Sequence, residues 1–143
     1  MESVYKLAEQ YHLEENNCVE SVVKACNDSM NLNLPDVAIR MACGLGGGIG
    51  RSGCVCGALS GSCLIISALV GRLDPSEKEL PEVYQYTHEF HDRFKAHFGT
   101  TCCRALNRLS FGTPEYRKQC INITATAADM VSDFIEEKGL LKK

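Results

Sequence analysis

Glycine is concentrated in one short segment of this chain, and this limits what the segment can fold into. Eight of the twelve glycines lie between Gly44 and Gly61. Glycine weakens helices and strands and readily adopts positive φ, so residues 44–53 are expected to form a loop whose main chain other groups can approach closely. The cysteines that flank this loop are Cys43, Cys54 and Cys56.

Cysteine is the second unusual feature. Nine of the 143 residues are cysteine, and the N-terminal residues do not form a hydrophobic signal segment. In a reducing cytoplasm such thiols are free, bound to metal or redox-active, rather than paired as in a secreted scaffold. Because nine is odd, at least one cysteine has no partner within the chain. Sulfur chemistry is therefore the first interpretation, either as redox exchange or as binding of a soft metal or iron–sulfur cluster.

The overall composition argues against several other classes of protein. The net charge is -3 and no basic run is interleaved with aromatic residues, which argues against a nucleic-acid partner. The longest apolar stretch, residues 63–70, is far shorter than the roughly 20 residues of a membrane-spanning helix, which argues against a membrane partner. We therefore expect a cytoplasmic protein with a single helical domain over residues 1–143.

Apolar residues recur at three- and four-residue spacing, which predicts helices throughout the chain. The expected helices cover residues 2–15, 18–30, 35–42, 54–70, 76–98, a short segment ending at residue 109, and a last segment from about 113 to 137. We expect an all-α bundle of six to seven helices, in which a glycine-rich loop precedes a buried central helix. The small residues that would let another helix approach this central helix are Gly57, Ala58, Gly61 and Ser62.

Cys54 and Cys56 form a C-x-C pair at the expected start of the central helix. Unpaired amides at a helix start lower the pKa of a nearby thiol, and the neighbouring Arg51 acts in the same direction. The pair could otherwise be two small residues at a crowded junction. A functional role is favoured, because the cysteines and the glycines are concentrated in the same segment.

The other cysteines fall into three groups. Cys102 and Cys103 open a further short helix, and adjacent cysteines rarely bridge each other, so the two are expected to face different partners. Cys18 and Cys120 lie near the starts of two long helices. The cysteines that fit apolar helix faces, and that we interpret as packing residues, are Cys26, Cys43 and Cys63.

This pattern resembles the C_GCAxxG_C_C family, whose members are described as redox-active proteins of about this size. The resemblance covers nearly the whole chain, and the segment Gly-Gly-Gly-Ile-Gly-Arg before Cys54 is also typical of the family. The four characteristic cysteines would correspond to Cys18, Cys56, Cys103 and Cys120. The cysteines that this chain adds to the minimal pattern are Cys26, Cys43, Cys54, Cys63 and Cys102.

The leading hypothesis is a redox site in which the four family cysteines converge at one end of the bundle. In a dithiol system with thiol oxidoreductase activity, Cys56 would be the nucleophile and a second family cysteine would resolve the mixed disulfide. Alkylation near neutral pH would then favour Cys56. The partner would be a redox protein, a small thiol or another electron donor.

The alternative is a zinc or iron–sulfur site with the same four sulfurs as ligands and Cys54 as an additional candidate. A similar helical region in a split-Soret cytochrome is associated with an iron–sulfur site. Amides of the glycine loop could hydrogen-bond to cluster sulfurs. The residues expected to surround a cofactor are Gly47, Gly48, Gly50, Arg51 and Gly57.

A third hypothesis is a non-catalytic helical domain that binds a partner. It accounts for the helices but not for the placement of the cysteines. The small residues of the helix over residues 54–70 and the apolar stripe over residues 80–98 also favour a homodimer.

Overall fold

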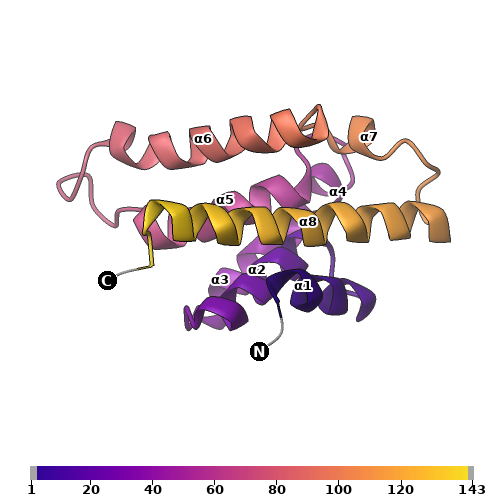
Figure 1. Ribbon diagram of the computed structural model, residues 1–143, viewed down its shortest axis with the longest axis horizontal. Coiled ribbons are helices and arrows are strands. Elements are labelled where there is room, and N and C mark those ends of the chain that lie inside the picture. The colour runs from indigo at the N-terminus through magenta and orange to yellow at the C-terminus, as the bar shows by residue number, and fades with distance from the viewer. Residues whose placement is uncertain (1–2, 142–143) are drawn as a thin grey trace.

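The computed structural model describes residues 3–141, which form an all-α protein (Figure 1). The helices are α1 (Val4–Leu13), α2 (Cys18–Met30), α3 (Asp36–Ala42), α4 (Gly46–Ile49), α5 (Gly57–Val70), α6 (Leu80–Phe98), α7 (Cys103–Leu106) and α8 (Pro114–Lys138). α4 is a kinked glycine segment rather than a regular helix, which leaves seven helices in the described range. The expected all-α bundle of six to seven helices is therefore confirmed.

Two expectations reach beyond the described residues. The first helix was expected to begin at residue 2, which lies outside them, and a single domain over residues 1–143 stays a prediction. Within residues 3–141, none of the helices combines the length and the apolar character that crossing a membrane requires.

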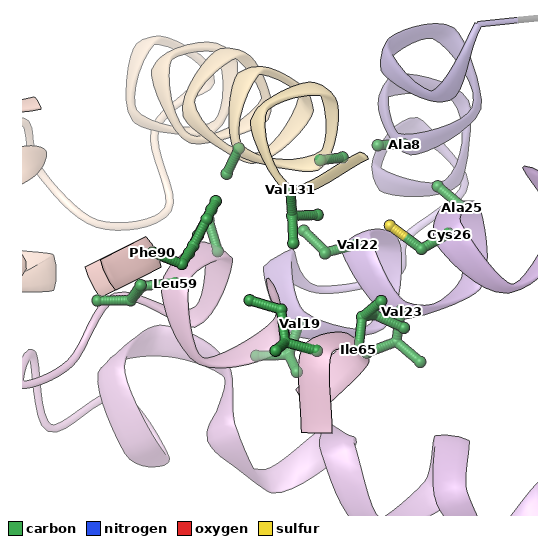
Figure 2. Close-up of a cluster of buried hydrophobic side chains, with 14 of the residues drawn as sticks. Ala8, Val19, Val22, Val23, Ala25, Cys26, Leu59, Ile65, Phe90 and Val131 are labelled. Atoms are coloured by element: carbon green, nitrogen blue, oxygen red, sulfur yellow. The ribbon is translucent and has the colours of Figure 1, made fainter. Parts of the chain in front are cut away.

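The hydrophobic core lies where α2, α5 and α8 meet. α8 runs along the molecule with α5 behind it, α6 on one side and α1 to α3 on the other (Figure 1). α2 contributes Val19, Val22 and Cys26 to the buried cluster in Figure 2. Ile65 of α5 and Val131 of α8 belong to the same cluster. Burying one aliphatic side chain contributes about 1.5–3 kcal/mol, so each of these core residues stabilises the packing of the three helices.

Glycines on α5 let this helix lie directly against α2. A Cβ atom on Gly61 would lie 3.3 Å from the carbonyl oxygen of Val19. A Cβ atom on Gly57 would overlap Cys18 Sγ and would lie 2.8 Å from Val19 Cγ2. The close helix approach expected from small residues is therefore present at these two positions.

The central helix begins later than expected, at Gly57. The residues before it are extended because they pair with the segment that precedes α7. Cys56 N–H donates to Thr101 O at 2.8 Å, and Cys103 N–H donates to Cys54 O at 2.7 Å. Pairing between segments that are distant in sequence leaves no local pattern, so helical spacing alone misplaces this boundary.

Two later helices are also shorter than expected. α6 begins at Leu80 rather than at residue 76, because Glu79 caps it and forms a capping box with Glu82. α7 is a single turn that ends at Leu106, before the expected residue 109.

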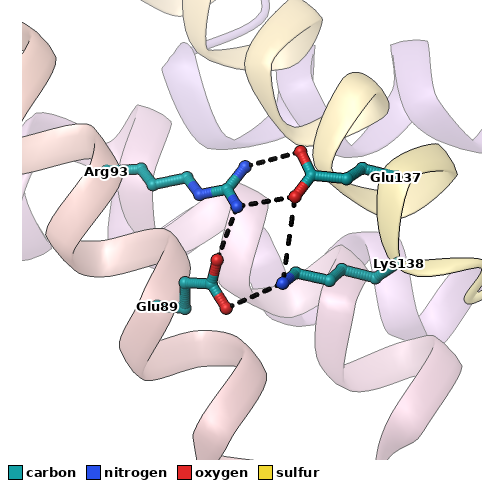
Figure 3. Close-up of polar contacts among 4 residues, drawn as sticks. All are labelled: Glu89, Arg93, Glu137 and Lys138. Carbon is teal, nitrogen blue, oxygen red and sulfur yellow. Dashed lines mark hydrogen bonds and ion pairs between the residues drawn. The ribbon is translucent and has the colours of Figure 1, made fainter.

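An ion-pair cluster joins α6 to the end of α8 (Figure 3). Arg93 of α6 donates to both carboxylate oxygens of Glu137, at 2.9 and 2.7 Å, and also contacts Glu89. Lys138 closes the cluster at 3.0 Å from Glu89, and both cations lie over the ring of Phe134. Exposed ion pairs are individually weak, so the cluster mainly fixes the orientation of α6 on α8.

The glycine segment is a compact turn rather than an open loop. Gly47 and Gly48 have φ values of 68° and 70°, which an L-residue with a side chain rarely adopts. Main-chain hydrogen bonds fold the turn back on itself: Gly53 N–H donates to Gly47 O, and Cys54 N–H donates to Gly48 O, each at 3.1 Å. The turn thereby holds its amides in fixed positions beside the starts of α2 and α5.

Candidate functional site

The cysteines at positions 18, 56, 103 and 120 line one cavity of about 390 Å³. Each comes from a different part of the fold. Cys18 begins α2, Cys56 directly precedes α5, Cys103 begins α7 and Cys120 lies within α8. Three of the four are at helix starts, where backbone N–H groups without helical partners can hydrogen-bond to sulfur. The fold thus brings together the four cysteines that the motif singled out.

Cys18 has the most favourable surroundings for a thiolate. It directly follows Asn17, the N-cap residue of α2, and its side chain is buried. Its sulfur accepts hydrogen bonds from the Cys120 thiol and from the N–H groups of Gly47 and Val19. The hydrogen bond from Cys120 is the main cause that lowers the pKa of Cys18 to about 7, although burial acts in the opposite direction.

Cys56 is in a different situation, although it also sits at a helix start. Burial raises the pKa of Cys56 to about 12, despite hydrogen bonds from the N–H groups of Ala58 and Leu59. The guanidinium of Arg51, which was expected to assist it, instead lies 4.3 Å from the centre of the Phe111 ring. The expected lowering of the Cys56 pKa is therefore not supported.

Cys103 and Cys120 complete the cavity. Burial raises the pKa of Cys103, while a hydrogen bond from the Tyr116 hydroxyl acts to lower it. The pKa of Cys120 is raised, first by its hydrogen bond to Cys18 and then by burial. In the Cys18–Cys120 pair, Cys120 is therefore the thiol that keeps its proton.

The five residues expected around a cofactor occupy different places. Gly47 donates its N–H to Cys18, and Gly47, Gly50, Arg51 and Gly57 all line the cavity. Gly48 is buried behind Cys103: a Cβ atom on it would lie 2.8 Å from Cys103 Cβ. The glycine turn therefore directs one amide at the sulfurs, and otherwise makes room for them.

All nine cysteines are free thiols, and five of them differ from the four above in their surroundings. Cys54 is exposed outside the cavity, and Cys43 is exposed at its edge. Cys26 is buried in the hydrophobic core, as its apolar helix face predicted. Cys63 packs against that core, and the Cys102 thiol contacts Gly53 O at 3.3 Å.

A larger groove of about 1300 Å³ lies beside the cavity, between α1 and the start of α8. The residues that line both hollows are His12, Arg51, Phe111, Tyr116 and Cys120. A molecule lying in the groove would therefore have access to the Cys120 side of the sulfur cavity.

Sequence reasoning missed two residues of this site. Tyr116 lies one helical turn before Cys120 on α8, so the four-residue spacing was an available signal. His12 left no comparable signal. Its Nδ1 is buried without a hydrogen-bond partner in the described part of the chain, and burial lowers the pKa of His12 to about 4. His12 is therefore a neutral imidazole at neutral pH.

The cavity was also considered as a metal site. It offers four thiols and the N–H of Gly47. Within residues 3–141, however, no group of three or more His, Cys, Asp or Glu side chains is arranged to hold a metal ion. As they lie here, the thiols therefore do not fit a single-ion site.

Comparisons with known proteins agree with the motif. A protein from Archaeoglobus fulgidus named "Uncharacterized protein" is 28% identical over 134 residues, which is 87% of this chain and 88% of the relative. No solved structure matches the chain. The model of the family described as "Putative redox-active protein (C_GCAxxG_C_C)" matches residues 16–134, which include all four cavity cysteines. This chain therefore belongs to the C_GCAxxG_C_C family.

Proposed function

We propose that the protein transfers electrons through a dithiol–disulfide pair formed by Cys18 and Cys120. The observation that carries this proposal is that the two side chains line the same cavity, where the Cys120 thiol lowers the pKa of Cys18 and its own pKa is raised in turn. Thiols that line one cavity and act on each other's pKa need only a small movement to form an S–S bond. The family description as redox-active supports the same class of chemistry.

The exchange follows from the unequal protonation of the two thiols. The Cys18 thiolate attacks one sulfur of an external disulfide, forms a mixed disulfide and releases the first partner thiol. Cys120 then loses its proton and attacks Cys18 Sγ, which releases the second partner thiol. In total, two thiols of the protein become one disulfide, and the two electrons and two protons leave with the two reduced partner thiols.

The surrounding groups have supporting roles in this scheme. The N–H of Gly47 stabilises the negative charge on Cys18 before the attack. A small external disulfide that reached the pair directly would enter through the groove beside Cys120. Cys56 and Cys103 lie in the same cavity and are available for further exchange.

Peptide mapping after oxidation tests this proposal. Protein purified without air is treated with oxidised glutathione, the remaining thiols are blocked, and the linked peptides are identified by mass spectrometry. We expect a Cys18–Cys120 link in the wild type and in a Cys63→Ser control, whose cysteine does not line the cavity. Cys18→Ser and Cys120→Ser should each abolish the link. Full oxidation that leaves Cys18 and Cys120 as free thiols would contradict the proposal.

A second candidate function is electron transfer through an iron–sulfur cluster held by the same four thiols. The convergence of four soft ligands and one loop amide on one cavity favours it. Metal analysis with a visible absorption spectrum on protein purified without air separates the candidates. Iron with a sulfide-to-iron charge-transfer band supports a cluster. Metal-free protein that loses two thiols on mild oxidation supports the dithiol.

A further inference from the structure

Cys54 lies outside the sulfur cavity, yet the fold places it opposite one of the cavity cysteines. The short antiparallel pairing around the Val55–Cys102 bridge sets Cys54 directly across from Cys103, whose N–H donates to Cys54 O at 2.7 Å. Residues that face each other in this way have Cα atoms about 5.5 Å apart and side chains on the same face. Disulfides span Cα separations of about 4.4–6.8 Å, so the backbone geometry allows a Cys54–Cys103 bond.

Gly48 brings these two cysteines close together. A Cβ atom on Gly48 would lie 2.5 Å from Cys54 N and 2.8 Å from Cys103 Cβ. Cys54 N–H also donates to Gly48 O at 3.1 Å. The backbone of one cysteine and the side chain of the other therefore pack against the same glycine.

The exposure of the cysteines defines a path from the surface to the cavity. Cys18 is only 6% exposed, so a folded protein partner has little direct access to it. Cys103 lines the cavity and is partly exposed, whereas Cys54 is exposed at the surface. Cys103 is thus the cavity cysteine whose backbone is paired with an exposed cysteine.

We infer that Cys54 and Cys103 form a second dithiol that relays electrons between a disulfide partner at the surface and the Cys18–Cys120 pair. This inference rests on the function proposed above and adds an entry route to it. The route assigns a role to Cys54, one of the cysteines that this chain adds to the family pattern.

The relay balances as four exchanges. The Cys54 thiolate attacks an external disulfide and releases one partner thiol. Cys103 then attacks Cys54 Sγ, releases the second partner thiol and forms the Cys54–Cys103 bond. The Cys18 thiolate attacks Cys103 Sγ and frees Cys54. Finally, Cys120 attacks Cys18 Sγ and frees Cys103, so two electrons have moved from Cys18 and Cys120 to the external disulfide.

The test measures how fast oxidised glutathione forms the Cys18–Cys120 link in Cys54→Ser and in a matched control, Cys102→Ser. Cys102 is adjacent to Cys103 but faces Val55 on the other side of the pairing. We expect Cys54→Ser to slow formation of the link by about tenfold or more, and Cys102→Ser to leave it unchanged. Equal rates in wild type and Cys54→Ser would overturn the relay, because the partner then enters directly through the groove.

A second measurement identifies the intermediate itself. In Cys18→Ser the relay stops after its second exchange, so Cys54–Cys103 peptides should accumulate. Acid quenching of the wild type at early times detects the same peptides without any substitution. Absence of this link in both experiments would overturn the relay even if Cys18–Cys120 still forms. Absence of the Cys18–Cys120 link in the wild type would instead refute the proposed function. The Cys54–Cys103 link detected at early times tests the second dithiol independently of that result.

Discussion

Cys18 and Cys26 lie about two turns apart on the same helix and are both buried, with 6% and 0% of their surface exposed. Burial raises the pKa of Cys26 to about 12, whereas the pKa of Cys18 is lowered to about 7. Burial is thus common to both thiols and does not decide which of them ionises. The difference comes from hydrogen-bond donors, which reach Cys18 and not Cys26.

The position of each cysteine along α2 explains why the donors differ. Cys18 is at the start of the helix, where N–H groups have no helical carbonyl to pair with. The glycine turn adds the N–H of Gly47 there, and α8 adds the thiol of Cys120. Cys26 lies in the helix interior among aliphatic side chains of the core (Figure 2). The same residue type therefore serves as a candidate reactive group at one end of α2 and as packing in its middle.

Of the substitutions predicted here, Gly57→Ala should have the largest effect on the surroundings of Cys18. The new Cβ atom of Gly57→Ala would overlap Cys18 Sγ, so we expect the free energy of unfolding to fall by about 2–3 kcal/mol. The displaced thiol should also lose its low pKa. Urea unfolding followed by circular dichroism, together with titration of the thiolate, checks both effects.

The matched control is Gly61→Ala, one turn further along α5 towards the core. Its Cβ atom would lie 3.3 Å from Val22 Cβ, and the better helix propensity of alanine partly offsets this crowding. We expect stability within about 1 kcal/mol of the wild type and an unchanged Cys18 pKa. Equal behaviour of the two variants would mean that Gly57 does not make room for the Cys18 sulfur.

Exchanging the sulfurs for oxygen should separate stability from reactivity. Cys26→Ser buries a hydroxyl in an apolar core and should lower the free energy of unfolding by about 1–2 kcal/mol while Cys18 keeps its reactivity. Cys18→Ser should show the opposite pattern, with the smaller change in stability and no thiolate near neutral pH. Chemical unfolding measures the stability of each variant, and thiol titration measures its reactivity. A Cys26→Ser protein without a thiolate near neutral pH would show that Cys26 is not only a packing residue.

The two thiols also affect stability in opposite directions as the pH changes. The folded pKa of Cys18, about 7, is below its unfolded value of 9.0, so its contribution is fully present above pH 9 and is lost as the pH falls through 7. Between these values stability should rise with pH, by at most about 1.4 kcal/mol per unit. Cys26 and Cys56 have raised pKa values, so the unfolded chain ionises first and stability should fall above pH 9.

Unfolding measured from pH 6 to pH 10 in wild type and Cys18→Ser tests this dependence. The rise below pH 9 should disappear in Cys18→Ser, and the fall above pH 9 should remain. An identical rise in both proteins would assign it to another group.

The smallest expected effect concerns the hydroxyl that reaches Cys103. Tyr116→Phe removes the donor and keeps the ring, so the pKa of Cys103 should rise. Loss of one such hydrogen bond, about 0.5–1 kcal/mol, should slow alkylation of Cys103 roughly threefold near pH 8. The titration of Cys18 should not change. Faster alkylation of Cys103 in the variant would show that Tyr116 shields the thiol instead of stabilising its charge.

The sequence predicted the all-α fold and the core, because apolar spacing is a local signal. It also singled out the four cysteines that line the cavity, through the motif they share with the family. It chose Cys56 rather than Cys18 as the nucleophile, because both stand at helix starts and Arg51 is near Cys56 in the sequence; the pKa directions of the two thiols favour Cys18 instead. That distinction depends on donors from Gly47 and Cys120, whose positions follow from the packing of segments far apart in the chain.

For the same reason, the sequence could not predict that Cys54 and Cys103 lie opposite each other. Helical spacing extends the central helix through Cys54, and only the long-range hydrogen bond from Cys103 reveals an extended segment. The neutral state of His12 beside the cavity could not be predicted either, because it depends on burial by elements that are distant in sequence.

The most direct test of the central claim is a pH titration of thiolate ultraviolet absorbance in reduced wild type and in Cys18→Ser, since it does not require a reagent to enter the cavity. The account predicts that the wild type forms one thiolate with a midpoint near pH 7 and that Cys18→Ser lacks it. A wild-type protein with no thiolate below about pH 8, or a neutral-pH transition that persists in Cys18→Ser, would contradict the claim that donated hydrogen bonds activate the buried Cys18.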